Sequence, residues 1–370
     1  MPIAPVEGPL SLRGFAWLAL ALTAALCASI AGFNALVDPT AQLGTGVLEP
    51  VAAGPRDRTA KVELLGRDPV PPLVVLGSSR SKKLDPRWLD APDGVNGAVV
   101  GGDLFEARVL AAWLSERWAG FGDGRSTAYP QLVVGVDVEQ FRDSSLQGSG
   151  FLDVPELAQV ARDEAAGSDG SVGDELDRLE RLLLTWQVTK ASAASVRARV
   201  RGGPKPGGAA DERVESGFSS TGVPTADAAW EAPGAPQRLS RPTPGAIDRS
   251  IAELRATYEA NGATVDDGAV DDLRALVRIV HEADGPAPLL YVTPAHPQLA
   301  AALDDVGRRE RSARVLALLR EVARGGRAVV IDCSKCIDPD QSNWIDGTHP
   351  SPLGARQLAA RLSDELAPAT

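Results

Sequence analysis

Four short, continuous apolar runs constrain this chain to a fold with a buried sheet. They are PPLVVLG (71–77), QLVVGVDV (131–138), APLLYVTP (287–294) and RAVVIDC (327–333), with GVNGAVVGG (94–102) as a weaker fifth. Strands that are buried on both faces have this pattern, because polar residues do not alternate with the apolar ones. We therefore expect these runs to form a parallel sheet.

Helical patterns separate the apolar runs. They cover residues 103–118, 271–283, 298–323 and 352–366. Strands that alternate with helices form right-handed βαβ units, and ligands bind such sheets at the carboxyl ends of the strands. The sequence thus predicts an α/β domain over residues 71–370, in which Gly77-Ser78-Ser79 stands at a strand end.

An uncharged apolar stretch covers residues 14–37, after a short tail of residues 1–13. Its 24 residues are enough for a helix that crosses a bilayer core of about 30 Å. The stretch is longer than the usual apolar part of a signal peptide, so a retained anchor is favoured, with a signal peptide cleaved near Ala31 as the alternative. Residues 38–70 begin with many prolines and glycines, and we expect a stalk or lead-in there.

An insertion at about 173–250 interrupts the alternation of strands and helices. Leucines recur at helical spacing in its first part, 173–200, which predicts a helix that lies on the sheet or caps the site. Residues 201–250 are rich in glycine and proline, which is typical of a long surface excursion.

Charge and cysteine content argue against two kinds of function, nucleic-acid binding and zinc binding. The net charge is −11, which argues against nucleic-acid binding because neutralisation of phosphates supplies most of that affinity. Cys333 and Cys336, in CSKC, could form a tight disulfide, bind a metal or do redox work. Neither a second cysteine pair nor a nearby histidine cluster completes a zinc set, so we expect no metal and favour a disulfide or two idle thiols.

Two histidines stand in predicted loops where they could take part in chemistry. His349 stands three residues after Asp346 in NWIDGTHPSPLG, before the last helix. A serine hydrolase needs an imidazole base and a carboxylate that orients it, and an Asp at this spacing can reach Nδ1 and leave Nε2 free. Alternatively, Asp346 caps the last helix or its turn and His349 is a surface loop residue. His296, in TPAHPQ, fits either a substrate contact or a rigid turn.

The order of these motifs resembles the SGNH (GDSL-like) hydrolase superfamily. A strand is followed by G-x-S, an Asn-Gly and Gly-rich segment comes next, a G-V-D strand end follows, and D-x-x-H precedes the last helix. More narrowly, the chain is similar to membrane-anchored bacterial branches, namely the alginate O-acetylation proteins and the D-alanyl transfer protein of teichoic acids. The similarity extends from about Asp38 to Leu366 and implies a three-layer α/β sandwich with a parallel sheet, SGNH or flavodoxin-like, behind an N-terminal transmembrane helix.

The resemblance also implies roles for individual residues. Ser79 falls on the family's nucleophile, His349 on its base and Asp346 on the carboxylate that orients the base. The oxyanion would be bound by the backbone N–H of Ser79 and by that of Gly101 or Gly102, between which the motif does not choose.

The chain departs from the family pattern in two places. Ser78 stands where an Asp is usual, and Asp137 stands where the family's Asn donates to the oxyanion. An ionised carboxylate only accepts hydrogen bonds, so Asp137 cannot take over that task. Asp137 could instead pair with Arg80, which directly follows the nucleophile; alternatively, Arg80 forms a salt bridge elsewhere.

These features together predict a membrane-anchored, SGNH-like acyl esterase or acyltransferase that acts on an envelope or secreted glycan without a cofactor. The alternative is a non-catalytic scaffold or glycan-binding subunit of an envelope assembly, because a shared fold does not imply a shared function. The resemblance implies a single-pass protein of the bacterial inner membrane with its C-terminal domain outside the cytoplasm. Its expected partners are the membrane, a glycan or acylated envelope polymer, and envelope assembly proteins.

Overall fold

A computed structural model gives the structure of the protein. It describes residues 12–37, 56–119, 129–141, 219–223, 244–325 and 327–366, together with single residues and pairs between 154 and 200. The chain divides into two compact units, which we describe separately. The anchor unit comprises residues 1–55 and 170–207, and the α/β unit comprises residues 56–169 and 208–370.

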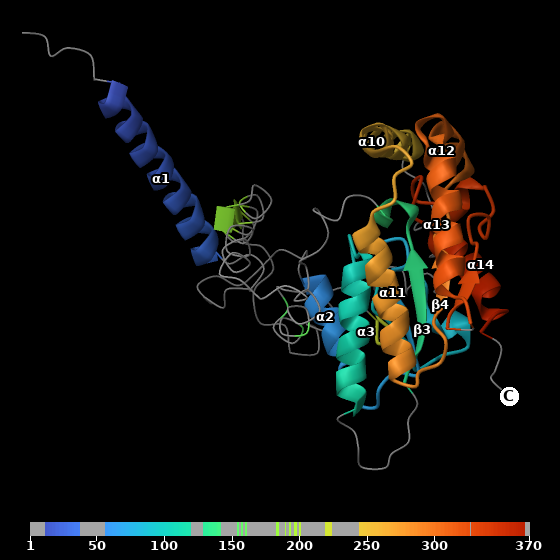
Figure 1. The fold of residues 1–370 in the computed structure, drawn as a ribbon. Helices are drawn as coiled ribbons and strands as arrows, with labels where there is room; N and C mark the ends of the chain where they lie inside the picture. The colour runs from blue at the N-terminus through green and yellow to red at the C-terminus, as the bar shows by residue number, and fades with distance from the viewer. Residues whose placement is uncertain are drawn as a thin grey trace, which may run out of the picture. The chain divides into compact units, whose positions relative to one another are not determined.

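A sheet runs through the α/β unit, in which β3 and β4 are labelled in Figure 1. It has five strands in the order β2-β1-β3-β4-β5, and all neighbouring strands pair in parallel. The strands are β1 (Leu73–Leu76), β2 (Val95–Asn96), β3 (Gln131–Val136), β4 (Leu289–Val292) and β5 (Val329–Ile331). Each predicted apolar run supplies one strand, and the weaker fifth run supplies only the two residues of β2. The prediction of an α/β fold with a parallel sheet is confirmed.

Helices and short 3-10 turns connect the strands. The helices of this unit are α2 (Arg56–Leu65), α3 (Leu104–Ala119), α10 (Ala246–Asn261), α11 (Asp267–Glu282), α12 (Pro297–Ala302), α13 (Arg308–Val322) and α14 (Pro352–Ser363). The 3-10 turns are η1 (Pro86–Leu89), η2 (Val138–Phe141), η5 (Asp304–Val306) and η6 (Gln341–Asn343).

One predicted helix is divided in the structure. The pattern over residues 298–323 predicted a continuous helix, but α12, η5 and α13 occupy it in turn. Gly307 separates η5 from α13 with a φ of +95°, a left-handed conformation that favours glycine.

Side chains of the strands alternate between two buried clusters on opposite faces of the sheet. Val74 and Val134 belong to a cluster with side chains of α2, α3, α11 and α13. Val75 and Val133 belong to a second cluster with side chains of η1 and α14. In Figure 1, α3 and α11 lie side by side over the sheet, and they also pack against each other. Burial on both faces explains why the strands are continuously apolar.

Two segments outside the predicted strands and helices join the α/β unit. Val62 and Leu65 of α2, at the C-terminal end of the predicted lead-in over residues 38–70, are buried in the first cluster. Within the predicted surface excursion, Thr221 accepts a hydrogen bond from the N–H of Asn96 at 2.8 Å and so covers the edge of β2. Residues 38–55 and most of the predicted insertion lie outside the described residues.

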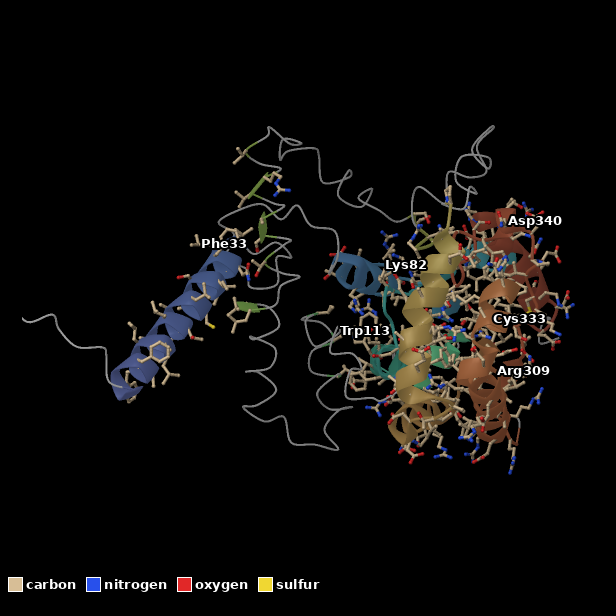
Figure 2. The ribbon with its side chains drawn as sticks, turned by 90° about the horizontal axis from the view of Figure 1, so that it is seen from above. Phe33, Lys82, Trp113, Arg309, Cys333 and Asp340 are labelled. Carbon is tan, nitrogen blue, oxygen red and sulfur yellow. A yellow bond between two sulfur atoms is a disulfide. The ribbon has the colours of Figure 1, made fainter. Side chains whose placement is uncertain are left out.

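The anchor unit contains α1 (Leu12–Val37). Within the part of the chain that the structure describes, one helical stretch, Gly14–Val37, is long and apolar enough to cross a membrane. Its side chains are mostly exposed, and Figure 2 shows Phe33 projecting from it. Near its end, Asn34 Nδ2 donates to the carbonyl of Leu183 at 2.7 Å and to Thr189 Oγ1 at 3.0 Å. These two residues of the predicted insertion helix therefore contact α1.

Candidate active site

The strand order places a site at one edge of the sheet. The order changes direction between β1 and β3, and open parallel sheets bind ligands at the carboxyl ends of strands that flank such a point. Ser79 follows β1, Asp137 follows β3 and Thr293 follows β4. These three residues therefore converge where the fold is most suited to hold a ligand.

A tight turn at the end of β1 presents Ser79. Gly77 has a φ of +138°, and a Cβ at that position would lie 2.8 Å from Ser81 Oγ, so the turn requires glycine. Ser78 is buried, and its Oγ accepts the N–H of Arg80 at 3.1 Å. Ser78 therefore shapes the turn, whereas the half-buried Ser79 directs its hydroxyl into the site.

The structure brings together the three residues predicted as a triad. Ser79 Oγ lies 2.8 Å from His349 Nε2, although the two residues are 270 positions apart. His349 Nδ1 lies 2.8 Å from Asp346 Oδ2. An imidazole held in this way can take a proton from the serine hydroxyl while the carboxylate holds the Nδ1 proton. The geometry is that of a Ser-His-Asp triad, and the catalytic roles of its members stay a prediction.

Asp346 is held as an ionised carboxylate by its own loop. Its Oδ1 accepts the backbone N–H groups of Thr348 at 2.8 Å and His349 at 2.9 Å. Burial raises the pKa of Asp346, but the hydrogen bond and charge interaction with His349, together with these N–H donors, outweigh burial and hold the pKa well below its usual range. Of the alternative role for Asp346, the helix cap does not hold because Ser351 caps α14, whereas Asp346 does cap its own turn.

Neighbouring elements fix the loop that carries Asp346 and His349. Between them, Gly347 donates its N–H to Ser250 Oγ of α10 at 3.3 Å and accepts the N–H of His296 at 2.9 Å. A Cβ on Gly347 would collide with Leu299 of α12, so the loop lies tightly against both helices. Sequence reasoning missed Ser250, which stands within the predicted excursion 201–250.

His296 is part of this support. It is 6% exposed, its Nδ1 accepts the N–H of Gln298 at 3.2 Å, and its Nε2 lies 3.2 Å from the carbonyl of Pro339. Burial lowers the pKa of His296, in keeping with a neutral ring that carries its proton on Nε2. Both ring nitrogens thus contact backbone groups. Of the two roles predicted for His296, this favours the rigid turn over the substrate contact.

The backbone N–H groups predicted to bind an oxyanion differ in their hydrogen bonds within the protein. Gly102 uses its N–H in a hydrogen bond to the carbonyl of Val99 at 3.2 Å, and Val99 in turn donates to the carbonyl of Gly77 at 3.1 Å. Among the described residues, none accepts a hydrogen bond from the N–H of Ser79 or of Gly101. The geometry therefore favours Gly101 over Gly102 as the second donor.

A buried ion cluster stands behind the nucleophile. Arg80 Nη1 lies 2.7 Å from Glu139 Oε2, and Arg80 Nε lies 3.6 Å from Asp137 Oδ2. Thr293 Oγ1 donates to Asp137 Oδ1 at 2.7 Å. Burial alone would lower the pKa of Arg80, but Glu139 and Asp137 raise it, so the cation is retained. Arg80 and Asp137 do pair, and both side chains are over nine-tenths buried, so their role at a substrate site stays a prediction.

Two residues of this region were missed at the level of sequence. Glu139 is the closer partner of Arg80. Gln140 accepts the N–H of Asp137 through Oε1 at 2.9 Å and donates from Nε2 to the carbonyl of Gly102 at 2.8 Å, so it ties β3 to the glycine turn. A signal was present, because both residues directly follow the strand end in GVDVEQ.

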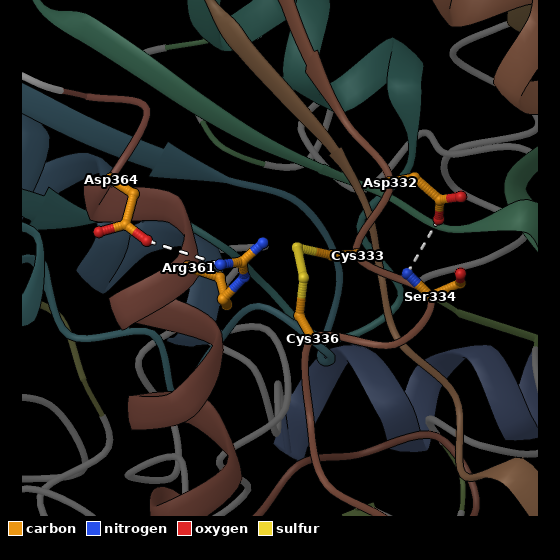
Figure 3. Close-up of a disulfide and its surroundings, with 6 residues drawn as sticks. All are labelled: Asp332, Cys333, Ser334, Cys336, Arg361 and Asp364. Carbon is orange, nitrogen blue, oxygen red and sulfur yellow. Dashed lines mark hydrogen bonds and ion pairs between the residues drawn. A yellow bond between two sulfur atoms is a disulfide. The ribbon is translucent and has the colours of Figure 1, made fainter.

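The cysteine pair lies after β5, outside the triad. Cys333 and Cys336 are joined in a disulfide, and Cys333 is buried in the second cluster (Figure 3). Over the described ranges, groups of three or more His, Cys, Asp or Glu side chains that could hold a metal ion are not found. The disulfide therefore cross-links the turn that follows β5.

Comparison with models of known protein families finds no match, and comparison with curated proteins finds none either. Function must therefore be inferred from the site itself.

Proposed function

We propose that this protein is a membrane-anchored, SGNH-like acyl esterase or acyltransferase that acts on an envelope or secreted glycan. One observation carries the proposal: Ser79 Oγ, His349 and Asp346 are linked by two successive contacts of 2.8 Å at the carboxyl edge of the sheet. A serine alone is a weak nucleophile, and an adjacent oriented base is the arrangement that activates it.

Each step of an acyl transfer has a residue to perform it. His349 takes the hydroxyl proton as Ser79 Oγ attacks the acyl carbonyl, and Asp346 stabilises the imidazolium that forms. The same proton then goes to the leaving sugar oxygen, and an acyl-serine remains. Water or another sugar hydroxyl attacks this ester while His349 takes its proton, and His349 then returns that proton to Ser79 Oγ as the bond from Oγ to the acyl carbon breaks. Hydrolysis and transfer share all of these steps up to the final attack.

The oxyanion would be bound by the N–H groups of Ser79 and Gly101. Asp137 occupies the position of the family's Asn, and its carboxylate oxygens face Thr293 and Arg80. Loss of one oxyanion donor costs about 10²-fold or more in rate. We therefore expect slow turnover with simple esters, compared with an enzyme that has all three donors.

The proposal also includes a specific fold and a location in the cell, and three observations support these. Buried clusters on both faces of the parallel sheet support a three-layer α/β sandwich of the SGNH type. The helical stretch Gly14–Val37 supports a single span in the bacterial inner membrane. A disulfide between Cys333 and Cys336 supports an α/β unit outside the cytoplasm, because disulfides persist in oxidising compartments.

Alkaline phosphatase fused after Thr370 is expected to be active in intact bacterial cells, because this reporter needs an oxidising compartment to fold. Phosphatase activity of the fusion in cells is the measurement. The matched control is a fluorescent protein fused at the same position, which should not fluoresce if it is exported in an unfolded state. A fluorescent fusion together with an inactive phosphatase fusion would place the C-terminus in the cytoplasm and exclude an envelope substrate.

Full-length protein in detergent micelles is expected to react with a fluorophosphonate probe, because the oriented His349 makes Ser79 nucleophilic. Peptide mass spectrometry should locate the phosphonate on Ser79. The adjacent serine supplies a matched control, since the Ser78→Ala variant keeps the triad and should be labelled as well. Labelling on any other residue, or undiminished labelling of Ser79→Ala, would refute the assignment of the nucleophile.

A second candidate function is a non-catalytic scaffold or glycan-binding subunit of an envelope assembly. The acceptor-only Asp137 favours it, because it removes a donor that family enzymes use. Complementation of a deletion strain separates the two candidates. Full complementation by both Ser79→Ala and His349→Ala would favour the scaffold, whereas loss of complementation by both favours the enzyme.

A further inference from the structure

We propose that α10 is a positioning clamp that sets the separation between the nucleophile Ser79 and its base His349, through Tyr258 on one side and Ser250 on the other. This inference rests on the proposed function and adds positioning residues to it. Helix α10 lies beside α12, near the end of the sheet to which the β3 arrow points (Figure 1).

Tyr258 connects α10 to the nucleophile side of the site. Its hydroxyl donates to Glu139 Oε1 at 2.9 Å, and Glu139 Oε2 lies 2.7 Å from Arg80 Nη1. Arg80 is the residue after Ser79, so the position of its guanidinium constrains the backbone that carries the nucleophile. Tyr258 is fully buried and makes this contact without access to substrate.

Charge makes this side of the clamp rigid. Burial alone would raise the pKa of Glu139, but the positive charges of Arg80 and Arg308, with the Tyr258 hydroxyl, lower it to about 2. Glu139 is therefore an anion at neutral pH, and its hydrogen bond with Tyr258 is a charge-assisted one. Such bonds are stronger than bonds between neutral groups, so α10 and the Ser79 turn are firmly connected.

Ser250 connects the same helix to the base side. Its Oγ donates to the carbonyl of Ala246 at 3.1 Å and accepts the N–H of Gly347 at 3.3 Å. Gly347 lies between Asp346 and His349, so this contact holds the backbone from which both side chains extend. A Cβ on Gly347 would lie 3.0 Å from Ser250 Cβ, which shows how closely the loop approaches α10.

The two contacts belong to one rigid element. Ser250 and Tyr258 are eight residues apart, about 12 Å along a helix axis. Tyr258 packs with Ala295, Leu299 and Leu303 in a separate buried cluster, and Leu254 contacts it from the middle of α10. A helix that holds both loops and is itself packed cannot move relative to one of them without a change in the distance from Ser79 to His349.

The clamp predicts that Tyr258→Phe and Ser250→Ala each lower the rate of inactivation by a fluorophosphonate. We expect about a tenfold fall in the maximal inactivation rate for each variant, because a displacement well below 1 Å in the reacting pair has effects of this size. The probe concentration at half-maximal rate should stay unchanged, since neither side chain contacts the probe. Full-length protein in micelles is used throughout, and Glu253→Gln, on the exposed face of α10, is the matched control.

A second measurement reports on the loop without any reaction. The chain has three histidines, so ¹⁵N-histidine NMR of the full-length protein can follow His349 beside His281 and His296. Ser250→Ala is expected to shift the ring signals of His349 and to leave those of His281 unchanged. Unshifted signals together with wild-type inactivation rates in both variants would overturn the clamp. Absence of labelling in the wild type would instead overturn the proposed function, while the NMR result would still decide whether Ser250 positions the loop.

Discussion

Alanine in place of Ser79 is expected to lower the hydrolysis of an aryl acetate ester by the full-length protein about 10⁴-fold or more, relative to wild type. His349→Ala should cause a loss of the same size, because without the base the hydroxyl stays a weak nucleophile. The double variant should lose no more than either single variant, since the two residues act as one unit. Initial rates under substrate saturation give the measurement.

The matched control for the histidine is His281→Ala. His281 is exposed on α11, and its replacement should leave the rate unchanged. Additive losses in the double variant, or a His349→Ala rate near that of wild type, would contradict a triad in which His349 Nε2 activates Ser79 Oγ over 2.8 Å.

Methionine in place of Arg80 is expected to lower the free energy of unfolding by about 3–5 kcal/mol, because it leaves buried carboxylates without their main cation. Glu139 Oε2 would lose its contact of 2.7 Å, and Asp137 Oδ2 its contact of 3.6 Å. Arg308 Nε, at 3.8 Å from Glu139 Oε1, would be the remaining cation among the ion pairs that the structure describes there. Thermal unfolding followed by circular dichroism should show a fall of about 10 °C in Tm.

An exposed arginine offers the matched control. Arg274 lies on α11 with half of its side chain exposed and forms ion pairs with Asp271 at 3.2 Å and Glu321 at 3.4 Å. Arg274→Met should cost less than about 1 kcal/mol, since water screens exposed pairs. Equal losses for the two variants would show that burial does not strengthen the Arg80 cluster.

The effect of Arg80→Met should also depend on pH. The pKa of Glu139 falls from an ordinary 4.5 to about 2 in the folded state. A group with a lowered folded pKa contributes stability that is present above its unfolded pKa and is lost as the pH falls through the folded value. The difference in Tm between wild type and Arg80→Met should therefore be smaller at pH 3 than at pH 7. A difference that grows on acidification would exclude Glu139 as the partner of Arg80.

The strands and one contact of the candidate site could be predicted from the sequence, because each depends on residues that are close together in the chain. Continuous apolar runs such as PPLVVLG predicted strands buried on both faces, and the structure confirms the α/β fold with its parallel sheet. Asp346 and His349 are three residues apart, so their contact follows from the spacing within one loop. Their contact with Ser79 was expected from the resemblance to the SGNH superfamily, and the alternation of strands and helices placed only Ser79 of the three at the edge where parallel strands end.

The tertiary structure alone decided which groups hold these residues in place. Tyr258 reaches Glu139 across 119 positions and Ser250 reaches Gly347 across 97, and neither contact has a periodicity that a sequence could display. The choice of Gly101 over Gly102 depends on a hydrogen bond from Gly102 to Val99 in a turn without a regular pattern. The sequence by itself determined the sheet and the spacing of Asp346 and His349, because apolar runs and short spacings act locally, whereas the choice of Ser79 came from the resemblance to the SGNH superfamily. Packing decided the supporting contacts, because each one depends on the relative placement of helices that only the folded chain defines.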